Sequence, residues 1–125
     1  VLPTRIARNG SLFVSTGRVN ITAAKFRNLE GPIERDCGCY TCCTFSAAYL
    51  HHLFRANELL AYRLATAHNV WFIVKLMQEI RSSILDSSFD TYRIDFAQRF
   101  VPTDEQTRLS QKKKWEKTKG FCRKL

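Results

Sequence analysis

Four of the five cysteines of the chain lie within residues 36–43, which read DCGCYTCC. Cys37, Cys39 and Cys42 form the pattern C-x-C-x-x-C, so three thiolates can converge on one tetrahedral ion. Zinc suits such a set because it accepts sulfur and nitrogen ligands without a geometric preference from d electrons. A chain of 125 residues has only a modest core, so the pattern predicts a small fold that a metal ion holds together.

Disulfide bonds and a redox pair are the two alternatives to a metal. Cysteines two residues apart rarely reach a relaxed S–S geometry, and the adjacent pair Cys42 and Cys43 would need a strained ring. A redox pair would be Cys39 and Cys42, but that motif normally lies in a βαβ unit, and none is visible. The first ten residues lack the apolar segment of a signal peptide, so we expect a reducing, cytoplasmic setting that favours metal ligands.

The fourth ligand is less obvious than the three cysteines. Cys43 cannot easily turn back while its neighbour ligates. His51 and His52 are adjacent, so at most one of them can face the cluster, and His68 stands near the predicted start of a long helix. Spacing alone favours His68 and leaves the other two histidines open. Three thiolates and an imidazole would fill the tetrahedron and leave no place for an activated water, so the metal is predicted to be structural.

The charge of the chain indicates a polyanionic partner. Twenty Lys and Arg stand against eleven Asp and Glu, which gives a formal net charge of +9. Nucleic acid is the usual partner of so basic a domain, although part of the charge can belong to a solvated face. No run of apolar residues is long enough to span a membrane, so we expect no membrane partner.

Periodicity predicts a small α+β domain with more helix than strand. Residues 10–26 read as a β-hairpin, with a turn at residues 15–17 and alternation of Val19 and Ile21 with polar residues. The first predicted helix comprises residues 44–56, and a short helix with Asn57 as its N-cap follows it. The longest predicted helix comprises residues 66–85 and has a buried stripe of Ile73, Met77, Ile80 and Ile84. A last short helix carries Phe96 and Phe100.

Four motifs occur in a fixed order: PTRIARNG (3–10), CGCYTC (37–42), AYLHHLFRANELL (48–60), and HN (68–69) followed by LMQEIRSSI (76–84). Together they resemble the C-terminal portion of bacterial-type tRNA-guanine transglycosylases, also called queuine tRNA-ribosyltransferases. The resemblance covers about residues 1–100. It implies an end-of-barrel segment and hairpin (1–36), a zinc subdomain with a long helix (37–85), a terminal helix (86–100) and a basic tail (101–125).

The resemblance implies a fold and an activity for the full-length enzyme. Members are (β/α)8 barrels with a zinc subdomain near the C-terminus, so this chain would correspond to the end of the barrel and that subdomain. They exchange guanine at the wobble position of certain tRNAs for a 7-deazaguanine, either preQ1 or queuine. An aspartate attacks the ribose C1′ and forms a covalent tRNA intermediate.

The resemblance also implies roles for individual residues. It gives one structural Zn²⁺ per chain, a tRNA partner that binds through its anticodon loop, and a homodimer. The implied zinc ligands are Cys37, Cys39, Cys42 and His68, the implied tRNA contacts are Arg5 and Arg8, and the implied dimer face is Phe45, Tyr49 and His52. Other roles stay open: the two arginines could pair with barrel carboxylates, the aromatic face could belong to the core, and Lys112–Lys114 could attract phosphate or be solvated.

No residue of the chain matches the catalytic aspartates of the family. The nucleophile would stand two residues before Val1, so we expect the isolated chain to be inactive as the C-terminal piece of a transglycosylase. The alternative function is a stand-alone, non-catalytic module, held together by zinc, that binds RNA or dimerises. The +9 charge and a metal site contained wholly within the chain favour that alternative.

Overall fold

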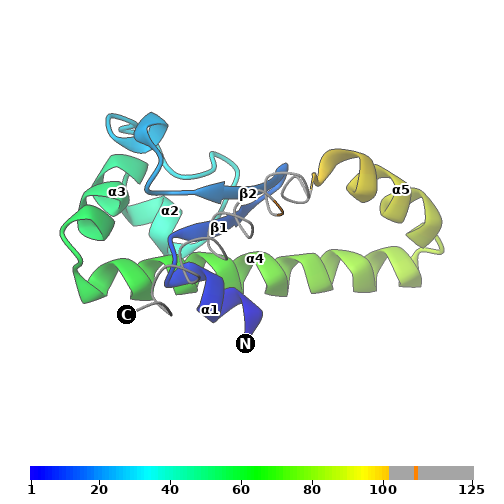
Figure 1. Ribbon diagram of the computed structural model, residues 1–125. Coiled ribbons are helices and arrows are strands. Elements are labelled where there is room, and N and C mark those ends of the chain that lie inside the picture. The colour runs from blue at the N-terminus through cyan, green and yellow to red at the C-terminus, as the bar shows by residue number, and fades with distance from the viewer. Residues whose placement is uncertain (102–108, 110–125) are drawn as a thin grey trace, which may run out of the picture.

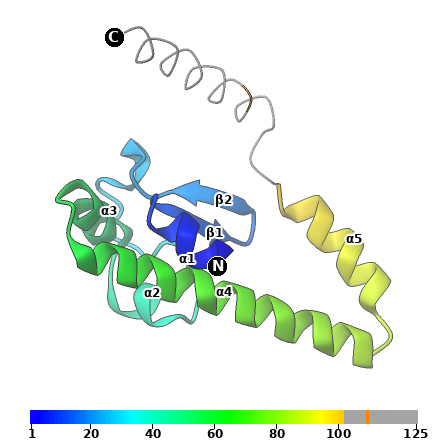
Figure 2. The same ribbon diagram turned by 60° about the horizontal axis from the view of Figure 1, so that its bottom comes forward.

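A computed structural model describes residues 1–101 and 109 of the chain. One long helix, α4, runs along the molecule, and the other elements gather on it (Figures 1 and 2). In chain order the elements are α1 (Leu2–Ala7), β1 (Ser11–Val14), β2 (Gly17–Asn20), the 3-10 helix η1 (Ala24–Phe26), α2 (Tyr40–Thr44), α3 (Ala47–Arg55), α4 (Leu59–Leu85) and α5 (Phe89–Arg99). The predicted class, mostly helical with a small antiparallel sheet, is confirmed.

The predicted hairpin is present as β1 and β2. The two strands pair from Ser11 opposite Asn20 to Val14 opposite Gly17. Gly17 closes the turn with a φ of +138°, and a Cβ atom there would clash with the carbonyl oxygen of Val101. Only glycine therefore fits at this position, since it has no side chain and tolerates positive φ.

Helix α1 precedes the hairpin and was not predicted. Its proline lies in the first turn, where the fixed φ of proline suits a helix and its missing N–H costs no hydrogen bond. Ile6 and Ala7 are buried, and α1 packs on α4 and β1. The helix is short, so its stability depends on this packing, which periodicity over six residues cannot reveal.

The junction between α3 and α4 differs from the prediction. Asn57 is not an N-cap: it has a left-handed φ of 58° just after α3, a conformation that asparagine tolerates better than most residues. The chain reverses there, and α4 begins at Leu59 with Glu58 as its N-cap. The predicted short helix is thus the first part of a continuous helix that starts seven residues before the predicted residue 66.

The main core lies between the hairpin, α3 and the first half of α4. Its buried members are Ala7, Leu12, Ile21, Phe26, Ala47, Leu50, Leu53, Ala61, Leu64 and Ala65.

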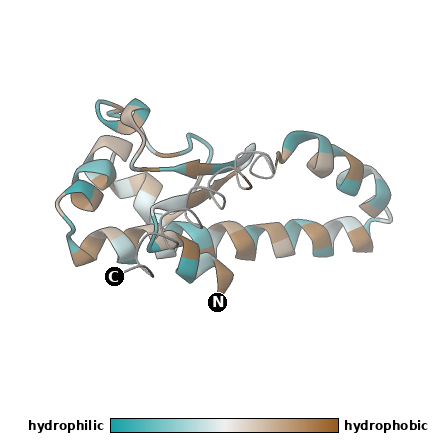
Figure 3. Ribbon diagram, viewed as in Figure 1, coloured by the Kyte–Doolittle hydropathy of each residue, from teal (hydrophilic) through white to brown (hydrophobic). Residues whose placement is uncertain are grey.

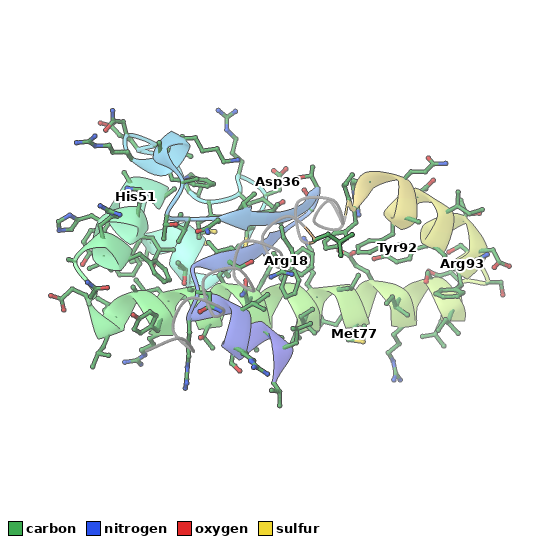
Figure 4. All side chains as sticks on the ribbon, viewed as in Figure 1. Arg18, Asp36, His51, Met77, Tyr92 and Arg93 are labelled. Carbon is green, nitrogen blue, oxygen red and sulfur yellow. The ribbon has the colours of Figure 1, made fainter. Side chains whose placement is uncertain are left out.

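The prediction of a buried stripe in the second half of α4 is wrong in part, because the side chains of Met77 and Ile84 are 52% and 57% exposed. Figure 3 shows hydrophobic residues along this half, and Figure 4 shows Met77 pointing away from α5. No described helix is long and apolar enough to cross a membrane.

Helix α5 folds back over the end of α4, as the spacing of Phe96 and Phe100 predicts for a short helix. These two rings stack at 5.1 Å, and Phe100 also approaches Phe72 of α4 at 6.3 Å. The Tyr92 hydroxyl donates to Glu79 of α4 at 2.9 Å, and burial together with this carboxylate raises the pKa of Tyr92 to about 12. The predicted basic tail lies outside the described residues, apart from residues 101 and 109.

Candidate metal centre

The local backbone brings the three cysteine sulfurs together at the start of α2. Cys39 is the N-cap of this helix, and its sulfur accepts the backbone N–H of Cys42 at 3.3 Å. This is the geometry of a side-chain N-cap with sulfur in place of oxygen. It places Cys42 in the first turn beside Cys39, while Cys37 joins them from the preceding loop. The C-x-C-x-x-C spacing is thus a loop followed by one helical turn.

The middle of α4 supplies the fourth group. His68 Nδ1 lies 3.4 Å from the sulfurs of Cys39 and Cys42 and 3.6 Å from that of Cys37. All four ligand atoms lie within 4.8 Å of one another, and all four residues are buried. In a tetrahedral zinc site with a Zn–S distance of about 2.3 Å and a Zn–N distance of about 2.0 Å, the sulfur–nitrogen separation is about 3.6 Å. The four side chains therefore lie close enough to bind one metal ion, and their spacing suits zinc.

A hydrogen bond on the far side of the imidazole orients His68. Its Nε2–H donates to the carbonyl oxygen of Phe13 in β1 at 2.7 Å. This bond selects the tautomer whose unprotonated Nδ1 faces the sulfurs, as is usual for a histidine that ligates metal. The metal centre is thereby connected to the hairpin as well as to α4.

The neighbouring residue, Asn69, was not predicted to have a structural role. It is fully buried: its Oδ1 accepts the N–H of Phe13 at 3.0 Å, and its Nδ2 donates to the carbonyls of Pro3 and Ser11 at 3.1 and 3.0 Å. One side chain thus joins α4 to α1 and β1. The signal available in the sequence was an asparagine, a weak helix former, inside a long apolar helix.

Electrostatics of the cluster favour a bound cation. Burial opposes the charged form of His68, but the sulfurs of Cys39 and Cys42 and the carbonyl of Phe13 outweigh it and raise the pKa of His68 to about 10. Hydrogen bonds with the other two cysteines lower the pKa of Cys39 and, together with burial, raise that of Cys37. The lowered pKa of Cys39 and the raised pKa of His68 favour a positive charge at Nδ1 beside the Cys39 sulfur, which a proton supplies, or a divalent ion that takes the proton's place.

The other candidates for the fourth ligand lie elsewhere. Nδ1–H of His51 donates to the carbonyl oxygen of Ile21 at 2.8 Å, and His52 is exposed on α3. Cys43 is exposed, and its sulfur lies 4.0 Å from the carbonyl oxygen of Cys37. The position of Cys43 agrees with the prediction that it is not a metal ligand.

Arg5 and Arg8, the predicted tRNA contacts, are both exposed on or next to α1. Neither forms an ion pair with any residue that the structure describes. The alternative role, pairing with carboxylates of the barrel, concerns residues outside this chain and stays open.

The predicted dimer face is a partly exposed aromatic cluster. Phe45 is half-buried and packs on the main core, while its ring also stacks on Tyr49 at 5.3 Å. Tyr40 meets the edge of Phe45 at 5.9 Å, and Tyr49 and His52 are exposed. Phe45 therefore contacts the core, as the alternative role predicts, while the side chains of Tyr49 and His52 stay exposed.

The arrangement suits a structural role better than chemistry. A metal held by three sulfurs and one nitrogen has a complete tetrahedral shell. Ile33 and Trp71 pack against the cysteines and help to keep water out. The four side chains can hold the cysteine segment against α4, although α3 separates the two in the sequence.

Comparisons with known proteins point to one family. The sequence model of the family described as Queuine tRNA-ribosyltransferase matches residues 1–102. The chain is 57% identical over 115 residues to a queuine tRNA-ribosyltransferase of Dehalococcoides mccartyi, which covers 92% of this chain and 29% of that protein. It is 41% identical over 117 residues to the queuine tRNA-ribosyltransferase of Dictyoglomus turgidum, with 94% of this chain and 30% of the relative covered. The chain thus spans less than a third of the length of these relatives.

Proposed function

The chain belongs to the queuine tRNA-ribosyltransferase family, and on this premise we propose that it supplies the zinc-bound C-terminal part of a tRNA-guanine transglycosylase. The whole enzyme would exchange guanine at the wobble position of a tRNA for a 7-deazaguanine, preQ1 or queuine, in the cytoplasm. The observation that carries the proposal is the family match over residues 1–102 together with the buried cluster of three cysteines and one histidine.

In this proposal Cys37, Cys39, Cys42 and His68 bind one Zn²⁺, whose task is structural. The ion would hold the cysteine loop on α4, and the Phe13 carbonyl would orient His68 from the hairpin. Asn69, next to His68 on α4, fixes α1 through the Pro3 carbonyl. The zinc centre would therefore help to hold α1 in place. Arg5 lies in this helix and Arg8 directly follows it, and both are proposed below to contact RNA.

Arg5 and Arg8 are proposed to contact the anticodon loop of the tRNA. Both guanidinium groups are exposed and have no described carboxylate partner, and their forked donors match phosphate and base edges. Arg5→Ala/Arg8→Ala is expected to weaken binding of a guanine-containing anticodon stem–loop by about tenfold, because two phosphate-type contacts are lost. Fluorescence anisotropy measures this affinity.

The matched control for this variant removes two exposed arginines from α4, Arg63 and Arg81. It lowers the net charge equally and should change the affinity much less. Equal losses in both double variants would show that binding reflects net charge alone.

The unmodified chain should incorporate no labelled guanine into tRNA, because the four described aspartates are all exposed and none matches the catalytic motif. Robust exchange by the 125-residue chain would contradict the proposal.

The aromatic cluster of Phe45, Tyr49 and His52 is proposed to form a homodimer contact. Tyr49 stacks on Phe45, so its ring is already ordered before a partner arrives, which lowers the entropic cost of association. Tyr49→Ala is expected to shift sedimentation toward the monomer, with Tyr62→Ala on α4 as the aromatic control. An unchanged dimer fraction in Tyr49→Ala, or a monomeric parent chain, would count against this contact.

The alternative is a stand-alone module held together by zinc, which binds RNA or dimerises without catalysis. A core formed within the described residues supports it. The exposed apolar residues of α4, among them Val74, Met77 and Ile84, favour the first proposal, since a larger protein would cover them. A chain that stays monodisperse at high concentration favours the module, whereas aggregation favours a part of a larger enzyme.

A further inference from the structure

A polar pocket lies between η1 and α3, apart from the metal centre. Its volume is about 580 Å³, and Figure 4 shows His51 on α3, below the loop that carries η1. The lining residues are Thr22, Ala24, Arg27 and Asn28 from the η1 side, and Ala48, His51, His52 and Arg55 from α3. None of these described residues is acidic, and two are arginines.

The two arginines give the pocket uncompensated positive charge. Arg27 follows η1, Arg55 ends α3, and neither forms an ion pair with a described residue. Their charges therefore face a concave surface without a counter-charge, an arrangement that concentrates the electric field and attracts anions. Guanidinium groups also match the oxygens of a phosphate with paired hydrogen bonds.

A buried histidine adds a third polar group to this pocket. His51 is 9% exposed, and its Nδ1–H is held by the Ile21 carbonyl at 2.8 Å. Nε2 is then the ring atom left for a ligand. No buried side-chain nitrogen or oxygen of the described residues lacks a partner, so Nε2 must reach solvent, and the side chain lines the pocket. The amide of Asn28 can supply a neutral donor beside it.

We propose that this pocket binds a backbone phosphate of RNA, with Arg27 and Arg55 as the phosphate ligands and His51 at its floor. The choice of RNA as the polyanion rests on the proposed function. The pocket is separate from Arg5 and Arg8: α1 lies below α4 in Figure 1, whereas η1 and α3 lie above it. A long RNA could meet both surfaces, one near the anticodon loop and the other further along its backbone. The net charge of +9 is consistent with such an extended contact.

The test measures binding of a tRNA and of its isolated anticodon stem–loop by fluorescence anisotropy, from about 50 to 300 mM KCl. Arg27→Ala/Arg55→Ala should weaken tRNA binding by about tenfold and reduce the slope of log K against log salt by about 1.5, because two phosphate contacts are lost. Arg27→Lys/Arg55→Lys should restore most of the slope. Arg63→Ala/Arg81→Ala is the charge-matched control, and His52 stays unchanged because it also belongs to the proposed dimer face.

The outcomes separate this proposal from the function on which it rests. If the pocket variant binds tRNA like the parent while Arg5→Ala/Arg8→Ala does not, the pocket proposal is wrong and the proposed function stands. If the parent binds no RNA, both fail. If inorganic phosphate binds the parent chain but not Arg27→Ala/Arg55→Ala, and this variant keeps the RNA affinity of the parent, then the pocket binds an anion other than RNA and the pocket proposal is wrong. Zinc content and the unfolding midpoint are measured for every variant and should match those of the parent. If the charge-matched control loses as much tRNA affinity as the pocket variant, a specific phosphate site is refuted.

Discussion

A chain with Cys39→Ser is expected to lose its zinc and its cooperative unfolding transition. Structural zinc sites of this type contribute about 10–16 kcal/mol of apparent binding free energy, which is comparable to or larger than the whole stability of a small domain, about 5–15 kcal/mol. Cys39 is buried, lies 3.4 Å from His68 Nδ1, and also caps α2. Serine can cap a helix as Cys39 does here, so the substitution removes the ligand and leaves the cap of α2 in place. Metal analysis and circular dichroism on heating measure the two losses.

Cys43→Ser is the matched control, because it makes the same chemical change four residues away on an exposed side chain. It should keep one zinc per chain and melt like the parent. His68→Ala should behave like Cys39→Ser, since His68 is the one member of the four-residue ligand set that α4 supplies. Full zinc content in both ligand variants would refute the proposed ligand set.

Asn69→Ala should destabilise the fold strongly although this residue is not a metal ligand. It removes an acceptor from the buried N–H of Phe13 and a donor from the carbonyls of Pro3 and Ser11. Each buried group left unpaired costs about 1–3 kcal/mol, so the free energy of unfolding should fall by about 3–5 kcal/mol. Zinc affinity should fall about tenfold, because the Phe13 strand that orients His68 loses one of its connections.

Urea unfolding of the zinc-loaded chain measures the stability change for Asn69→Ala, and a competing chelator measures the affinity change. Asn28→Ala replaces an exposed asparagine and should alter the free energy of unfolding by no more than about 0.5 kcal/mol. A loss below about 1 kcal/mol in Asn69→Ala would mean that water or a neighbour replaces its hydrogen bonds. The connection from α4 to α1 would then not depend on this residue.

The metal centre could be predicted from the sequence because its chemistry is local. Three thiolates within six residues already restrict the geometry, and the order of motifs singled out His68 among three histidines. The hairpin was equally accessible, since Gly17 and the alternation around Val19 are short-range signals. In each case the residues that make the structure are close in sequence or are of types that rarely have another use.

The parts that were missed depend on contacts between distant residues. Helix α1 is stabilised by packing on α4 rather than by its own periodicity. The early start of α4 depends on Asn57 adopting a left-handed conformation, which its type permits but does not require. The apolar stripe around Met77 was read correctly as one face of a helix, but nothing within the described chain covers all of it. Periodicity reports which face is apolar and not what lies against it.

X-ray absorption at the zinc edge of the purified chain tests the central claim most directly. The account predicts one zinc per chain with three sulfur neighbours at about 2.3 Å and one nitrogen neighbour at about 2.0 Å. That shell would fit the separations of 3.4–3.6 Å between His68 Nδ1 and the three sulfurs. An oxygen neighbour from water, a shell with fewer than three sulfurs, or a chain that folds with no zinc at all would contradict it.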